Sequence, residues 1–182
     1  MNALISFVLQ SIGDDALCEL AGGNKNALEA IYREYGKLIY SIAFAILKSR
    51  EDSEDVLQDV MLKIARSAHR YRKGTSPKAW IASVARSCAM DHLQKNKDKL
   101  SLDDESVPIP FTEDNYDFIL LREALETLSD EDNLLIRLRY YAGLDLKEIA
   151  TVLCISHSAA RKRCSRALET LGKYFQERKD DQ

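Results

Sequence analysis

A basic run near the C-terminal end of the chain has chemistry that can be named from the residues alone. Between His157 and Arg166 there are four basic side chains and no acidic one. On one helix, such groups can contact DNA phosphates and, in the major groove, the edges of the bases. The side chains expected to face outward are Ser158, Arg161, Lys162, Arg163, Ser165 and Arg166. We expect a DNA-binding helix here, although an ordinary amphipathic helix with a solvated basic face would give the same local pattern.

The flanking residues predict the two helices that would present this run. Asp145 can cap a first helix, with Glu148 three residues later as its capping-box partner. Ser156 can cap a second helix after a turn at Cys154 and Ile155. The apolar faces would be Leu146, Ile149, Ala150 and Leu153 in the first helix, and Ala160, Cys164, Ala167, Leu168 and Leu171 in the second. This pattern predicts a helix-turn-helix.

A second predicted helix, Glu51–Ala65, has two faces of different chemistry. Val56, Leu57, Val60 and Ile64 fall on one side at helical spacing. Asp55, Gln58, Asp59 and Leu62 gather on the other. Carboxylates would repel DNA phosphates, so an acidic face with an exposed leucine suits a basic protein partner better. A plain solvated acidic face is the alternative.

Next to that helix lies a basic segment with an aromatic residue, AHRYRKGTSPK over 68–78. Tyr71 and Gly74 stand among Arg70, Arg72, Lys73 and Lys78, and Trp80, which follows, is expected in the core. Positive charge can track the phosphates of single-stranded nucleic acid while a loop holds an unstacked base. In the helix that follows, Ser87, Met90, Gln94 and Lys95 could face the same strand.

The composition indicates an all-α protein without a catalytic centre. The 182 residues carry a net charge of −3, with 7 Gly and 3 Pro, and contain no convincing alternating strand pattern. The four cysteines lack CxxC spacing and the three histidines lack metal-ligand spacing, so we expect reduced thiols, no metal and no cofactor. The apolar segment 3–13 is too short to cross a bilayer, and we expect a cytoplasmic chain that does not insert into a membrane.

The charge distribution divides the chain into three parts. Residues 1–97 carry a net charge of +3, residues 98–117 carry −6, and residues 118–182 are neutral. The middle part contains Pro108 and Pro110 and has little helical periodicity, which predicts an extended acidic linker between two helical domains. Outside the helix-turn-helix, the expected helices are Asn24–Leu47, Glu51–Tyr71, Pro77 to about Lys95, Tyr116–Leu128 and Ser129–Tyr141.

Three segments together resemble the extracytoplasmic-function sigma factors of bacterial RNA polymerase, group 4 of the sigma-70 family. They are EDSEDVLQDVMLKIARSAHRYR, SPKAWIASVARSCAMDHLQK and the helix-turn-helix, and the resemblance spans about Asp14–Phe175. It implies two domains, sigma region 2 over 1–97 and sigma region 4 over 118–182. It also implies a non-enzymatic protein that binds core RNA polymerase and promoter DNA, and in many members an anti-sigma factor.

The resemblance assigns a role to each group of residues. Asp55, Gln58, Asp59 and Leu62 correspond to a polymerase-docking surface, and the linker to a segment that passes through polymerase channels. The residues implied in −10 melting and capture are Tyr71, Arg72, Lys73, Ser76, Lys78, Ser87, Gln94 and Lys95. Those implied in −35 recognition are Ser158, Arg161, Lys162, Arg163, Ser165 and Arg166.

The sequence departs from the family pattern at several of these positions. Cys154 replaces the common turn glycine, where a left-handed backbone is wanted. Ser87 stands at a frequent asparagine position, Gln94 at a frequent arginine position, and Ala159 and Ala160 at a frequent Thr-Val pair. Promoter sequence, regulon and inducing signal stay open. A helix-turn-helix regulator that acts without polymerase is the alternative function, and it leaves the acidic face and linker unexplained.

Overall fold

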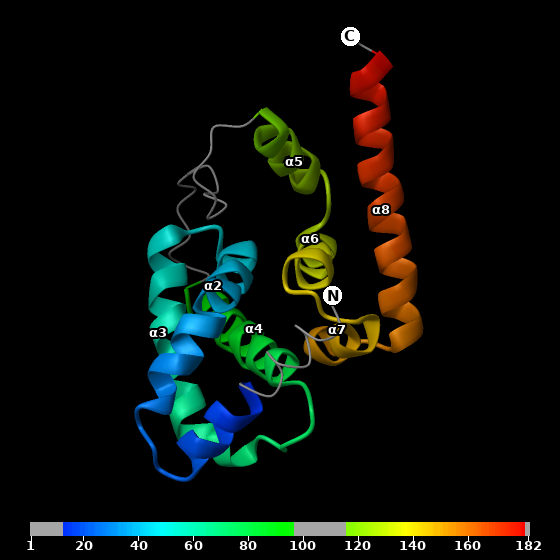
Figure 1. Ribbon diagram of the computed structural model, residues 1–182. Helices are drawn as coiled ribbons and strands as arrows, with labels where there is room; N and C mark the ends of the chain where they lie inside the picture. Colours follow the sequence, from blue (N-terminus) through cyan, green and yellow to red (C-terminus); the bar gives the residue numbers. More distant parts are fainter. Residues whose placement is uncertain (1–12, 97–115, 181–182) are drawn as a thin grey trace. The chain divides into compact units, whose positions relative to one another are not determined.

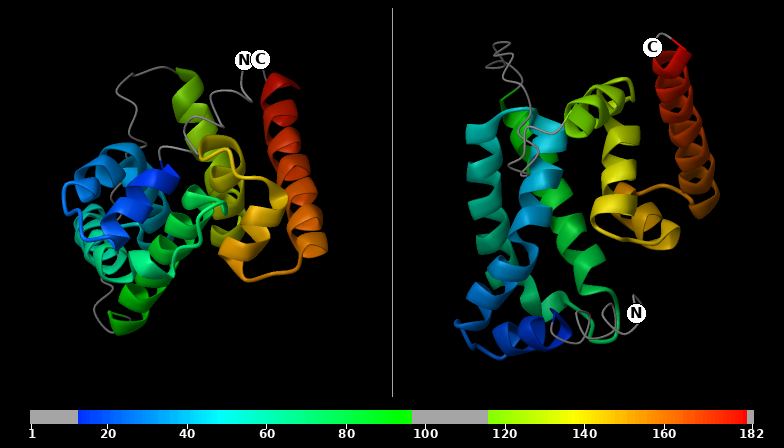
Figure 2. Two further views of the ribbon diagram at one scale, coloured as in Figure 1. Left: turned by 60° about the horizontal axis from the view of Figure 1, so that its bottom comes forward. Right: turned by 45° about the horizontal axis from the view of Figure 1, so that its top comes forward.

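The chain divides into two helical units. The computed structural model describes residues 13–96 and 116–180 (Figures 1 and 2). The units comprise Met1–Glu105 and Ser106–Gln182. All regular elements in the described residues are helical, which confirms the all-α class. Most of the predicted acidic linker and the apolar segment 3–13 lie outside the described residues, apart from Gly13 and residues 116–117.

Unit 1 is built on three long helices that contact one another: α2 (Ala27–Leu47), α3 (Arg50–Ser67) and α4 (Pro77–Lys95). A helical segment over 13–21 precedes them, and a short 3-10 turn, η1 (Ala68–Arg70), follows α3. The C-terminal half of α2, residues 38–47, is buried at nearly every position because α2 packs on both other helices. The fully buried side chains at the centre of the unit include Ile31, Ile39, Ile42, Val56, Val60, Ile64 and Ile81.

Unit 2 contains α5 (Tyr116–Glu126), α6 (Asp130–Ile136), the π-helical turn η2 (Arg137–Tyr141), α7 (Leu146–Leu153) and α8 (His157–Asp180). The long α8 contacts α5, α6 and α7 along its length (Figure 1). Buried side chains in this unit include Leu135, Leu138, Leu144 and Ile149, with Ala160 on α8 itself. The helix-turn-helix thus rests on α6 and η2.

Most helix boundaries agree with the sequence prediction to within a few residues. The expected helix Ser129–Tyr141 is α-helical to Ile136 and π-helical from Arg137 to Tyr141, and the N–H of Ala142 donates to the carbonyl of Arg137 at 3.0 Å. One placement is wrong: Leu168 was expected on the buried face of α8 but is 42% exposed.

Candidate nucleic-acid interface

The first helix of the helix-turn-helix begins with the predicted capping box. Oδ1 of Asp145 accepts hydrogen bonds from the backbone N–H groups of Lys147 and Glu148, both at 2.8 Å. In return, Oε2 of Glu148 accepts from the Asp145 N–H at 2.7 Å. Both side chains satisfy donors that the first turn of a helix leaves unpaired, so they fix the residue at which α7 begins.

The turn between α7 and α8 has the left-handed backbone that the family resemblance implies at Cys154. Cys154 lies at φ 56° and ψ 41°, a conformation that favours glycine. The N–H of Ile155 then donates to the carbonyl of Ala150 at 3.0 Å, which closes the end of α7. Oγ of Ser156 accepts from the N–H of Ala159 at 3.1 Å and caps α8, as predicted.

The outer face of α8 brings five of the six predicted −35 residues to the surface. Ala160, Cys164 and Ala167 are buried on the inner face. The exposed side chains of the outer face are Ser158, Arg161, Lys162, Ser165 and Arg166. Two hydroxyls and three cations on one exposed helix face form a surface that can both bind phosphates and donate to base edges.

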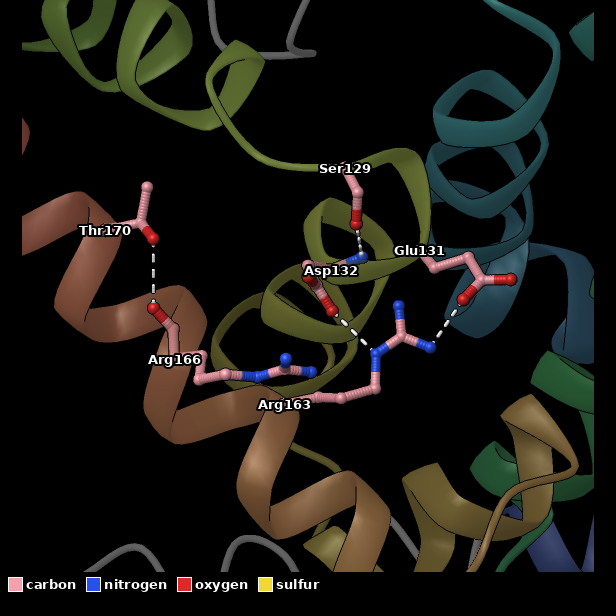
Figure 3. A network of polar contacts seen from close by, with 6 residues as sticks. All are labelled: Ser129, Glu131, Asp132, Arg163, Arg166 and Thr170. Carbon is pink, nitrogen blue, oxygen red and sulfur yellow. Dashed lines mark hydrogen bonds and ion pairs between the residues drawn. The ribbon is translucent and has the colours of Figure 1, made fainter.

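Arg163, the sixth, is placed differently from the prediction. Its Nε donates to Oδ1 of Asp132 at 2.7 Å and its Nη1 to Oε2 of Glu131 at 2.5 Å (Figure 3). Only 19% of the Arg163 side chain is exposed. Burial alone would lower the pKa of Arg163, but the hydrogen bonds to the two carboxylates raise it. Arg163 therefore ties α8 to the first turn of α6, and its guanidinium is engaged within the unit.

The acidic face of α3 is arranged as predicted. Val56, Val60 and Ile64 are fully buried against the other helices of unit 1. Met61 is buried as well, and Leu57 is only half-buried. The outward side chains, all exposed, are Asp55, Gln58, Asp59 and Leu62. Leu62 is 53% exposed, which leaves an apolar side chain one helical turn beyond Gln58 and Asp59.

The loop over 71–76, between η1 and α4, carries exposed cations above a buried tyrosine. Arg72 and Lys73 are exposed, but Tyr71, which the family resemblance implies in −10 melting and capture, is only 8% exposed. Its ring lies edge-on to Trp80, with centroids 5.7 Å apart. Ser76 caps α4 through a 3.1 Å hydrogen bond from the N–H of Ala79, so its hydroxyl stabilises the helix start.

The predicted contact residues on α4 lie at its surface or close to it. Ser87, Gln94 and Lys95 are exposed, and Lys78 is half-buried. Oγ of Ser87 accepts a hydrogen bond from Nζ of Lys63 at 3.2 Å. Lys63, on α3, therefore adds a cation beside the predicted −10 surface. The sequence pattern did not indicate this residue. Only a helix-packing prediction that placed α3 beside α4 could have found it.

Over residues 13–96 and 116–180, no three His, Cys, Asp or Glu side chains are grouped in a way that could hold a metal ion. None of the helices there is both long and apolar enough to cross a membrane.

Comparison with known proteins identifies the family. The Sigma-70 region 2 family matches residues 31–99, and the Sigma-70 region 4 family matches residues 124–173. RNA polymerase sigma factor SigV of Bacillus subtilis is 30% identical over 134 residues, which cover 72% of this chain and 81% of SigV. This chain is an extracytoplasmic-function sigma factor. The sigma factor SigX of the same organism is 24% identical over 165 residues, covering 84% of this chain and 85% of SigX.

Solved structures agree on the fold of this sigma factor. CnrH, solved in complex with the cytosolic domain of CnrY, matches with a TM-score of 0.68 at 18% identity, over 91% of this chain and 98% of CnrH. The sigma factor RpoE of Bartonella quintana, solved with the anti-sigma factor NepR, matches with a TM-score of 0.62 at 22% identity, over 76% of this chain and 90% of RpoE. The region 2 and region 4 matches fall in unit 1 and unit 2 respectively.

Proposed function

We propose that this sigma factor gives core RNA polymerase its promoter choice through contacts at two promoter elements. The observation that carries the proposal is a pair of exposed faces of opposite chemistry on separate units. The acidic face of α3 holds Asp55, Gln58, Asp59 and Leu62, and the basic face of α8 holds Arg161, Lys162 and Arg166. One face suits a basic protein surface, and the other suits DNA.

In this proposal, α8 reads duplex DNA at the −35 element. The capping box of α7 and the left-handed turn at Cys154 fix the direction in which α8 leaves the turn. Its N-terminal half would then enter the major groove, as in other helix-turn-helix proteins. Arg161, Lys162 and Arg166 would supply phosphate and base-edge contacts, while Ser158 and Ser165 would add hydrogen bonds.

Unit 1 would stabilise the opened −10 element. Arg72 and Lys73 of the loop, with Lys78, Lys95 and Gln94 of α4, offer positive and polar groups to a single strand. Binding energy gained only after the strands separate favours the opened state over the duplex. Because Tyr71 is buried, the extruded base would rest on the loop backbone and its polar side chains rather than on that ring.

Transcription with purified components tests the proposal. The full chain is added to cognate core polymerase over a library of promoter fragments, and transcripts are sequenced to find initiation sites. We expect new start sites that share two elements, and loss of that pattern in Arg161→Ala with Lys162→Ala. Transcription that stays the same with and without the chain would overturn the proposal.

A regulator that acts on DNA without polymerase is the second candidate. No described feature favours it, since it gives the acidic α3 face no role. Tight binding of the isolated chain to a specific duplex, with no affinity for core polymerase, would favour it over the first proposal.

We also propose that an anti-sigma factor holds this cytoplasmic chain inactive. The support is the fold that it shares with the sigma factor RpoE, solved with the anti-sigma factor NepR, together with its two exposed functional faces. The partner would cover the α3 face and compete with polymerase. Tagged chain purified from the native cell should bring down one stoichiometric protein that core polymerase displaces. Recovery of free chain and polymerase complex alone would count against it.

A further inference from the structure

The buried carboxylate of Asp14 lies beneath the 71–76 loop. Asp14 is 8% exposed, and its Oδ1 accepts a hydrogen bond from Oη of Tyr71. The same oxygen accepts from the backbone N–H of Gly74 at 3.4 Å. These two donors lie at the start and near the apex of the loop, so one side chain connects both to the helical segment 13–21.

The segment that carries Asp14 is closely seated on unit 1. A Cβ atom on Gly13 would collide with Oη of Tyr35 and lie 3.0 Å from Cβ of Pro77. Pro77 is the first residue of α4, where the loop ends. On the exposed side, Nζ of Lys73 lies 3.0 Å from Oδ1 of Asp15. The segment therefore contacts the loop at its beginning, middle and end.

Interactions within the loop also shape it. Gly74 lies at φ 87°, in the left-handed region that favours glycine. Thr75 bonds the carbonyl of Arg72, and Oη of Tyr71 lies 2.8 Å from the carbonyl of Thr75. Since Tyr71 has one hydroxyl proton, the carboxylate and this carbonyl share it, and the carboxylate is the stronger acceptor. Asp14 thus links the first residue and the apex of the loop to the segment 13–21.

We propose that Asp14 is a positioning residue that holds the 71–76 loop in the shape that receives single-stranded DNA. The inference rests on the proposed role of the loop at the −10 element. Asp14 itself does not contact DNA, because it is buried under the loop. It also precedes the part of the chain that the region 2 family matches, residues 31–99. A residue outside the family match therefore preorganises a surface inside it.

Hydrogen exchange of the free, full chain tests the contact without any DNA. In Asp14→Ala, amides of 72–76 should exchange about tenfold faster, because the acceptor of the Gly74 N–H and the Tyr71 hydroxyl is lost. Amides in α2 and α3 should keep their rates. Glu19→Gln is the matched control, since Glu19 is an exposed acid on the same segment whose carboxylate bonds only locally, to Asn24. Unchanged loop exchange in Asp14→Ala would overturn the inference.

Binding by the assembled polymerase tests the consequence. The probe is a fork-junction DNA with a single-stranded −10 element carrying 2-aminopurine, whose fluorescence reports an unstacked base. Asp14→Ala should weaken this binding about tenfold, with affinities for core polymerase and for a −35 duplex unchanged. Asp14→Asn should bind nearly as the wild type, because its Oδ1 can still accept both hydrogen bonds.

The outcomes separate the possibilities. Equal losses for core polymerase, −35 duplex and fork DNA would overturn the inference, because Asp14 would then support the whole unit. Tighter fork binding by Asp14→Asn would also overturn it, since the carboxylate would act by repelling phosphate. The wild-type assembly could fail to bind the fork-junction DNA while the amide exchange rates of 72–76 still respond to Asp14→Ala. In that case the proposed function fails, and the hydrogen bonds between Asp14 and the loop stand.

Discussion

Replacement of Arg163 by glutamine should lower stability without removing a DNA contact. The residue lies on the basic helix, yet its guanidinium bonds Asp132 at 2.7 Å and Glu131 at 2.5 Å. The Asp132 side chain is 22% exposed and that of Glu131 is 68% exposed. The two contacts therefore contribute differently to the free energy of unfolding, and the half-buried pair with Asp132 should contribute most of the stabilisation.

The magnitude follows from this difference in exposure. A hydrogen bond to a charged group contributes about 1.5–3 kcal/mol, and partial exposure of both groups reduces this to about 1–2 kcal/mol. The exposed pair with Glu131 adds about 0.5 kcal/mol or less. Arg163→Gln and Asp132→Ala should each lower the free energy of unfolding of unit 2 by about 1–2 kcal/mol, and Glu131→Ala by far less. In the variant that carries both the Arg163 and the Asp132 substitutions, the two losses of stability should not add, and the coupling free energy should be about 1 kcal/mol.

Two measurements separate a structural role from DNA contact. Thermal unfolding of the full chain gives the stability changes. The salt dependence of promoter binding by the assembled polymerase gives the number of phosphate contacts, because each lost contact reduces the slope by about 0.9. Arg163→Gln should leave the slope unchanged, whereas Lys162→Gln should reduce it. A reduced slope with unchanged stability in Arg163→Gln would refute the structural role.

Three further predictions concern the turn, the acidic face and pH. Cys154→Gly should stabilise unit 2 by about 0.5–1 kcal/mol. Glycine relieves about 1–2 kcal/mol of left-handed backbone strain but loses more conformational entropy on folding. Cys154→Ala, which keeps the strain, should give no gain in Tm. Leu62→Glu should weaken core polymerase binding about tenfold with an unchanged Tm. Tyr32 on α2 is equally exposed, and Tyr32→Ser should leave polymerase binding unchanged. Burial raises the pKa of Tyr35 to about 12 and, with the Asp14 hydrogen bond, raises the pKa of Tyr71. Because unfolded tyrosine ionises near pH 10, circular dichroism should show constant stability of unit 1 below roughly that pH and falling stability above it. Tyr71→Phe should flatten the fall, and stability unchanged to pH 12 would contradict the burial.

The sequence predicted the features that depend on local spacing. The capping box of Asp145 and Glu148 and the caps at Ser156 and Ser76 all involve residues within three positions of one another. Their geometry is set by the helix start or end itself, so a single segment contains all the information needed. The exposed acidic face of α3 was predictable for the same reason, since helical periodicity alone separates it from Val56 and Val60.

The sequence could not predict the features that depend on distant partners. Arg163 bonds Asp132, which is 31 positions away, and Tyr71 bonds Asp14, which is 57 positions away. A basic residue at the edge of a recognition helix and an aromatic in a basic loop both look like DNA contacts until their partners are placed. Leu168 is the opposite case. Its spacing aligns it with the buried residues of α8 and predicts burial, yet it is 42% exposed.

The engagement of Arg163 changes the electrostatics expected of the basic helix. One cation of the run faces two carboxylates, so the exposed face that can attract DNA has three, Arg161, Lys162 and Arg166. If each contacts one phosphate, the salt slope from α8 is at most about 2.7, well below that of proteins that bind DNA tightly unaided. Such a weak surface becomes effective when a second contact raises its local concentration at the promoter. A polymerase held by the α3 face would provide that contact, which makes weak DNA affinity of the free chain a consequence of the same residues that build the interface.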